Sequence, residues 1–132
     1  MARPRILPGK VGTAGTVAVE YAIVLPVLLL LTLGAMDIAR LLWTNITLAR
    51  ATEAAARCGA VSAATCPTTS LAGYAAGQAW GLRAISADNF TASTPSCGVQ
   101  VVGTYAFQFL VPWSFGRTTM TLTAAACYPA RS

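Results

Sequence analysis

An uninterrupted apolar stretch near the start dominates the pattern of hydrophobic and polar residues. Tyr21 to Met36 is sixteen residues without a charge, and Thr16 to Val19 extend it on the other side of Glu20. Counted from Thr16, the stretch is 21 residues long, close to the ~20 that a helix needs to cross a bilayer. It predicts a transmembrane helix. Pro26 removes one backbone hydrogen bond inside it and should kink or locally melt the helix.

The same helix is expected to continue beyond the apolar stretch. No Gly or Pro occurs between Asp37 and Cys58, and apolar residues follow at approximately helical spacing. This stripe consists of Ile38, Leu41, Leu42, Ile46, Leu48, Ala49 and Ala55. Charge pairs at spacings of three and four are expected on a solvated face, between Asp37 and Arg40, Arg50 and Glu53, and Glu53 and Arg57. One helix is predicted from about Thr16 to Arg57, ending near Cys58–Gly59 because Gly is a common stop.

The rest of the chain predicts a small mixed domain. A loop is expected over 62–70 and a shorter helix over 71–85, where Gly73, Gly77 and Gly81 would let it lie close against the long helix; a loose loop is the alternative. Apolar and polar residues then alternate over 99–111 and 119–126, which predicts two half-buried antiparallel strands joined by a turn around 112–117. The fold class is α+β: a long N-terminal transmembrane helix that continues as the spine of a small disulfide-bonded antiparallel β domain.

Four cysteines follow the apolar stretch, and they allow three connectivities. We expect Cys58 to pair with Cys66 and Cys97 with Cys127. Residues 97 and 127 have the same parity, whereas the two apolar rows face the helix only if residues of opposite parity pair. A bulge at Gly98 or Gly103 is therefore expected. A zinc site is the competing interpretation, disfavoured because the chain has no His.

Composition and charge exclude several classes of function. The chain of 132 residues is 55% hydrophobic and only 10% charged, unlike an ordinary soluble domain. Its net charge of +5 is concentrated in a leader that carries Arg3, Arg5 and Lys10, and no basic stripe suggests nucleic-acid binding. The only acids are Glu20, Asp37, Glu53 and Asp88. We therefore expect no catalytic residues, no bound metal, no cofactor and no enzymatic activity.

A basic leader before an apolar segment is typical of secretion or anchoring signals. Three forms are possible: a conventional signal peptide cleaved after Thr32-Leu33-Gly34, an uncleaved anchor, and a leader cut off on the cytoplasmic side before the helix. A carboxylate inside an apolar segment is costly and usually marks function, so Glu20 favours the third form. The alternative for Glu20 is a position at the membrane interface, with its carboxylate reaching water. The leader and the position of the cysteines place the C-terminal part outside the cytoplasm.

The start of the helix carries a specific resemblance. Gly15, four further residues and then Glu20-Tyr21 resemble the processing motif of tight-adherence type IV prepilins, and residues 15–57 resemble the TadE-like family of pseudopilins or minor pilins. The resemblance implies that a prepilin peptidase cuts between Gly15 and Thr16. It divides the chain into a cleaved leader (1–15), a transmembrane and spine helix (16–57) and an extracytoplasmic head domain (58–132).

The resemblance also implies an assembly function. Glu20 would become the fifth residue of the mature chain and would neutralise the terminal amine of a neighbouring subunit, because opposite charges tolerate burial only together. The implied partners are the prepilin peptidase, other pilins and pseudopilins, the inner-membrane pilus assembly platform and the lipid bilayer, with the protein in the inner membrane. The alternative is an uncleaved single-pass envelope protein whose outer domain binds a ligand or wall component through exposed aromatics, for which Trp80, Trp113 and Phe115 are candidates.

Overall fold

The computed structural model describes residues 14–111 and 118–130. The leader up to residue 13 and the turn 112–117, with Trp113 and Phe115, lie outside these ranges. The elements are α1 (Ala14–Val61), α2 (Leu71–Gln78), the 3-10 helix η1 (Ala87–Asn89), and the strands β1 (Phe90–Ser93), β2 (Val99–Gln108) and β3 (Thr119–Tyr128). This confirms the α+β class, with a long apolar N-terminal helix and a small antiparallel sheet.

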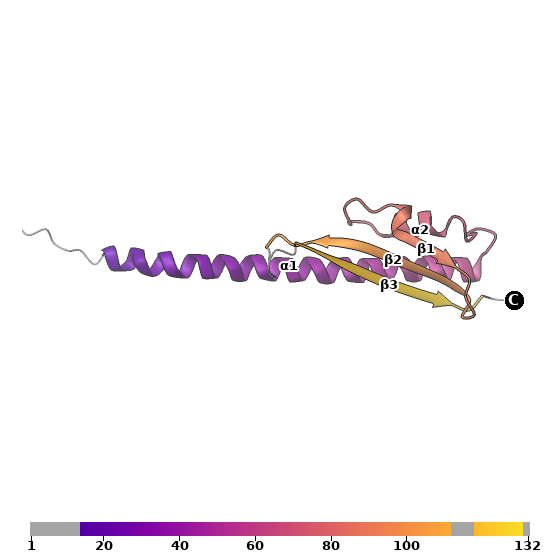
Figure 1. The fold of residues 1–132 in the computed structure, drawn as a ribbon, viewed down its shortest axis with the longest axis horizontal. Helices are drawn as coiled ribbons and strands as arrows, with labels where there is room; N and C mark the ends of the chain where they lie inside the picture. Colours follow the sequence, from indigo (N-terminus) through magenta and orange to yellow (C-terminus); the bar gives the residue numbers. More distant parts are fainter. Residues whose placement is uncertain (1–13, 112–117, 131–132) are drawn as a thin grey trace, which may run out of the picture.

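α1 determines the shape of the molecule. Its 48 residues make a rod about 72 Å long at 1.5 Å per residue. Figure 1 shows the sheet and α2 lying along the C-terminal half of the rod, while the N-terminal half projects alone. The helix runs without interruption through Pro26, and the kink expected there stays a prediction.

The predicted end of the helix at Cys58–Gly59 is wrong, because α1 continues to Val61. Gly59 has a packing role instead of a stop role. A Cβ at this position would lie 2.7 Å from Leu71 Cδ1 and 3.0 Å from Val99 Cγ1, closer than carbon atoms approach one another. The missing side chain lets α2 and β2 lie directly against the last turns of α1.

The predicted apolar stripe of α1 is confirmed at Leu41, Leu48 and Ala55, which are buried or packed against the core, and it is wrong at three large residues. Ile38, Leu42 and Ile46 are 50–60% exposed. The face that packs on the sheet consists mainly of small or short residues: Thr44, Thr47, Leu48, Ala51, Thr52, Ala55, Ala56 and Ala60. The bulk of the core comes from the other elements, as Leu71, Phe90, Val101, Phe107 and Leu122. Small helix residues allow the flat face of a sheet to approach closely, so volume is supplied by the strands.

The sheet has the order β1-β2-β3 and is antiparallel throughout. Val101 pairs with Ala126 and Tyr105 with Leu122, which confirms the predicted pairing of opposite parity. The buried row of β2, at Val99, Val101 and Phe107, faces α1. The pattern did not reveal β1, which has only four residues.

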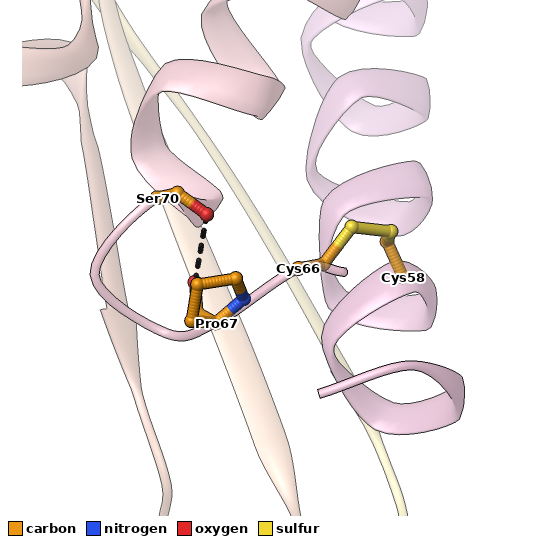
Figure 2. The surroundings of a disulfide bond; sticks show 4 residues. All are labelled: Cys58, Cys66, Pro67 and Ser70. Atoms are coloured by element: carbon orange, nitrogen blue, oxygen red, sulfur yellow. Dashed lines mark hydrogen bonds between the residues drawn. A yellow bond between two sulfur atoms is a disulfide. The ribbon is translucent and has the colours of Figure 1, made fainter. Parts of the chain in front are cut away.

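Both expected disulfides are present. Cys58–Cys66 joins the end of α1 to the loop that leads into α2, with the Cα atoms 5.8 Å apart. Figure 2 shows this bond beside the turn in which the Ser70 hydroxyl donates to the Pro67 carbonyl at 3.0 Å. Cys97–Cys127 ties the chain before β2 to β3. All four cysteines are therefore in disulfides, and none is left as a thiolate ligand for zinc.

The expected bulge is wrong. The register between β2 and β3 is unbroken from Val99–Tyr128 to Gln108–Thr119. Cys97 instead lies before β2, in a turn closed by a hydrogen bond of 3.0 Å from the Gly98 N–H to the Pro95 carbonyl. Gly98 has φ of +122°, which a glycine adopts at little cost. The turn brings Cys97 to Cys127 without disturbing the ladder.

The second helix is shorter than predicted and packs through other residues. α2 ends at Gln78, and Gly81 lies beyond it with φ of +84°. A Cβ at Gly73 or Gly77 would meet no atom within 4 Å. The expected close approach through these glycines is therefore wrong, and the contacts are made by Leu71, Ala75 and Ala79.

Two glycine substitutions test this packing. Gly59→Val should destabilise the fold by about 1–3 kcal/mol, because the new side chain overpacks the contact with Leu71 and Val99. Gly73→Ala, in open space, should stabilise it by up to ~1 kcal/mol through helix propensity. Denaturant unfolding of the full chain in detergent measures both changes. Equal effects of the two substitutions would contradict the assigned role of Gly59.

Candidate functional site

The N-terminal half of α1 presents apolar side chains to its surroundings on every side. Among the described residues, one helix is long and apolar enough to cross a membrane, with a mean hydropathy of 2.3 over its most apolar window. The exposed large residues there are Val17, Val19, Ile23, Val24, Leu25, Val27, Leu28, Leu29, Leu30, Leu31, Leu33 and Met36. The Thr32 hydroxyl donates to the Leu28 carbonyl at 3.0 Å, so it needs no water. An apolar surface all round a helix is the form that fits a bilayer, and the segment suggests single-pass anchoring.

The expected processing site lies in the first turn of α1. The helix begins at Ala14, so the Gly15–Thr16 peptide bond has helical geometry. Gly15 is exposed, and a Cβ added there would meet no atom within 4 Å.

Glu20 and Tyr21 lie about one turn further along. Both are exposed, Tyr21 at 70% of its surface. Within the described part of the chain, no ion pair and no hydrogen bond joins the Glu20 carboxylate to another side chain. Residue 20 lies four residues after Thr16, and residues four apart share one face of a helix. The carboxylate is thus available to a partner outside the chain or at residue 16.

Asp37 is the second carboxylate of α1, and it is completely buried. Its oxygens accept the Leu110 N–H at 3.0 Å and the Val111 N–H at 3.0 Å. Arg40 Nη1 also donates to Oδ1 at 3.1 Å. The carboxylate therefore ties the segment just after β2 to the helix, at the point where α1 leaves the sheet.

Sequence reasoning placed Asp37 on a solvated face and missed this function. The pair with Arg40 is confirmed, and the Arg40 guanidinium also lies 5.3 Å from the centre of the Phe107 ring. The pairs expected between Arg50 and Glu53 and between Glu53 and Arg57 do not form ion pairs in the described chain. One feature of the sequence could have indicated a special role for Asp37: it is the first charged residue after the apolar stretch. A charge beside apolar residues is the same feature that indicated a role for Glu20.

The structure also bears on two other candidates from the sequence, a metal site and the exposed aromatic residue Trp80. No group of three or more His, Cys, Asp or Glu residues in the described ranges could hold a metal ion. Trp80 is 70% exposed and lies edge-on to Trp43, with ring centres 5.9 Å apart. It belongs to the surface and not to the core.

Asp37→Ala tests the tether. It should destabilise the chain by about 2–4 kcal/mol, because two backbone N–H groups lose their acceptor. Hydrogen exchange at Leu110 and Val111 should accelerate more than exchange at Val101. Glu53→Ala, which removes an exposed carboxylate from the same helix, should change stability by less than ~0.5 kcal/mol. Unchanged protection at Leu110 in the Asp37 variant would contradict the tether.

The comparison with known families concerns α1. The model of the family described as TadE-like protein matches residues 15–57, which confirms the resemblance over the same residues. Neither a curated protein nor a solved structure matches the chain. The match covers about a third of the chain and leaves α2 and the sheet outside it. From Gly15 to Arg57, this chain carries a TadE-like segment, and that segment lies within α1.

Proposed function

We propose that this protein is a pseudopilin or minor pilin of a tight-adherence pilus assembly and secretion system. The observation that carries the proposal is the TadE-like match on a helix whose N-terminal half projects from the folded domain. The TadE-like family suggests a pilus-related protein that is structural and not an enzyme. The geometry of α1 supports the more specific function that we propose.

The projecting half of α1 is suited to two successive environments. Its apolar side chains are exposed on all sides, so lipid covers them at low cost while the protein is in the membrane. The same surface can pack against helices of other pilins and pseudopilins. Helix packing of this kind needs no enzyme activity, and the folded domain stays on the other half of α1 throughout.

The Glu20 carboxylate is the proposed assembly contact. Cleavage after Gly15 would create a positive amine at Thr16, one turn before Glu20 on the same helical face. In an apolar surrounding each charge alone costs several kcal/mol, and a pair costs much less. A neighbouring subunit that supplies its amine to Glu20 would thus be selected over lipid.

The proposed location is the cytoplasmic membrane, with residues 58–132 outside the cytoplasm. Two disulfides in the folded domain support this orientation, since disulfides persist in oxidising compartments. The proposed partners are a prepilin peptidase, other pilin-like subunits, the inner-membrane assembly platform and the bilayer. The leader would remain on the cytoplasmic side.

N-terminal sequencing tests the processing step. Protein from cells that contain the prepilin peptidase should begin at Thr16, and protein from cells without it should keep the leader. Gly15→Leu should block cleavage in the cells that contain the peptidase, because a side chain keeps the backbone away from the peptidase. A leader retained in all samples would favour an uncleaved single-pass envelope protein.

Glu20→Leu tests the assembly contact separately. Insertion into the membrane should stay normal or improve, because a charge is removed from an apolar segment. Crosslinking to pilin-like subunits should fall strongly, about tenfold if the contact contributes 1.4 kcal/mol. Glu53→Leu, on the other half of α1, is the matched control and should crosslink as the unmodified protein does. Normal assembly of the Glu20 variant would contradict the proposed pairing.

A further inference from the structure

The edge of β2 beside β1 is covered over only part of its length. β1 pairs with residues 100–103 of β2, whereas β2 has ten residues. Beyond Gly103, Asn89 Nδ2 donates to the Thr104 carbonyl at 3.1 Å, and the Thr104 hydroxyl donates to the Asn89 carbonyl at 3.5 Å. The chain that precedes β1 departs there into η1 instead of continuing along β2. Among the described residues, the second half of this edge therefore has no neighbouring strand.

The alternation of a strand identifies the groups on that edge. The Phe109 N–H donates to the Thr118 carbonyl on the β3 side at 2.8 Å, so even-numbered residues of β2 point their N–H and carbonyl groups to the open side. The Thr104 carbonyl is bonded to Asn89, and the Leu110 N–H to Asp37. Between them, Ala106 and Gln108 each present an N–H and a carbonyl. Both residues are exposed, and no hydrogen bond within the described chain uses these four groups.

The open edge forms one side of a groove of about 770 Å³. α1 contributes Ala39, Arg40 and Trp43, and the segment after α2 contributes residues 81–84. The Tyr105 hydroxyl donates to the Arg83 carbonyl at 3.1 Å, which fixes that segment against β2. A single added strand occupies about 4.8 Å beside an edge. An extended chain that adds beside β2 as a strand would therefore enter this groove.

The charge of the groove indicates which extended chain would fit. Arg40 and Arg83 line it, and no carboxylate does. Arg40 donates one hydrogen bond to Asp37, and its side chain stays 47% exposed, so its other N–H donors remain available. Successive side chains of an added strand point to opposite faces, and one set would contact Ala39 and Trp43. These walls favour apolar side chains at alternate positions, with an acidic residue nearby.

We propose that this groove binds an extended acidic segment of a partner protein, which adds to the sheet as a strand in line with β1. Its backbone pairs with the N–H and carbonyl groups of Ala106 and Gln108, and a carboxylate contacts Arg83 or Arg40. Strand addition of this kind obtains affinity from main-chain hydrogen bonds and specificity from alternate side chains. The interaction does not depend on cleavage of the leader or on Glu20.

The probe is a capped seven-residue peptide of alternating threonine and valine with a glutamate near each end, added to the full chain in detergent. Amide hydrogen exchange should slow at Ala106 and Gln108. A peptide N-methylated at alternate residues on its bonding edge should not produce this protection. Absence of protection at millimolar peptide, or protection on β3 instead, overturns the proposal.

Variants separate the backbone contact from the charge contact. Gln108→Pro removes an N–H from the open edge and should weaken peptide binding about tenfold or more. Thr121→Pro is the matched control, since by the same alternation its N–H points to the outer edge of β3, and it should leave binding unchanged. Equal weakening in both variants places the peptide elsewhere and overturns the proposal.

Arg83→Gln should weaken the glutamate peptide about two- to fivefold and should not affect a peptide with glutamine in place of glutamate. Arg50→Gln, an exposed arginine of α1 outside the groove, is the control and should behave as the unmodified chain. Loss of both peptides alike contradicts the charge contact. Binding of phosphatidylglycerol vesicles through Arg83, without any peptide binding, would replace the proposal with a lipid site.

Discussion

Burial of one face of a three-stranded sheet against one half of a single helix is the constraint on which this structure depends. β2 and β3 present their inward rows to α1, whose facing side carries small residues such as Ala51 and Ala55. The strands and α2 supply the volume, in Phe107, Leu122 and Leu71. A sheet without such a support would leave its apolar face in water, and the two disulfides secure the chain at its bends.

The same constraint divides α1 into two halves with different needs. The C-terminal half of α1 buries its inward face against the rest of the chain, and the N-terminal half has no face buried in this way. Asp37 lies at the boundary, where its carboxylate accepts hydrogen bonds from two N–H groups of the segment just after β2. Glu20 stands on the projecting half, and the described residues offer it no comparable donors. These two carboxylates of one helix thus differ in whether the chain itself supplies their hydrogen-bond donors.

Local pattern predicted the elements better than it predicted their contacts. Alternation over β2 and β3 predicted their pairing parity, because inward and outward rows are set by the pleat itself. The helix face was not predictable in the same way, because Ile38 and Leu42 look more like core residues than Ala51 and Ala56 do. The sheet required close approach, and only small residues allow that. Gly59 was misinterpreted for a related reason: the atoms that exclude its side chain belong to Leu71 and Val99.

Long-range contacts account for most of what the sequence did not reveal. The tether of Asp37 joins residues 73 positions apart, and no local spacing indicates it. β1 has four residues, too few for a convincing period of two, and its position depends on β2. The projecting apolar half, in contrast, needs no contact in the chain, and so its composition alone predicted it.

The edges of the sheet extend this argument to partners. Proteins commonly protect sheet edges with charges, prolines, bulges or covering loops. On β2 the chain covers the first part of the edge with β1 and then uses Asn89 and Asp37 to bond the groups on either side of Ala106 and Gln108. These two side chains thus bond the groups at both ends of the open stretch, and within the described chain the groups at its centre have no hydrogen-bond partner and lie beside Arg40 and Arg83. An edge that is protected at its ends and open at its centre limits the length of any strand that can add to it, and the groove walls limit its side chains.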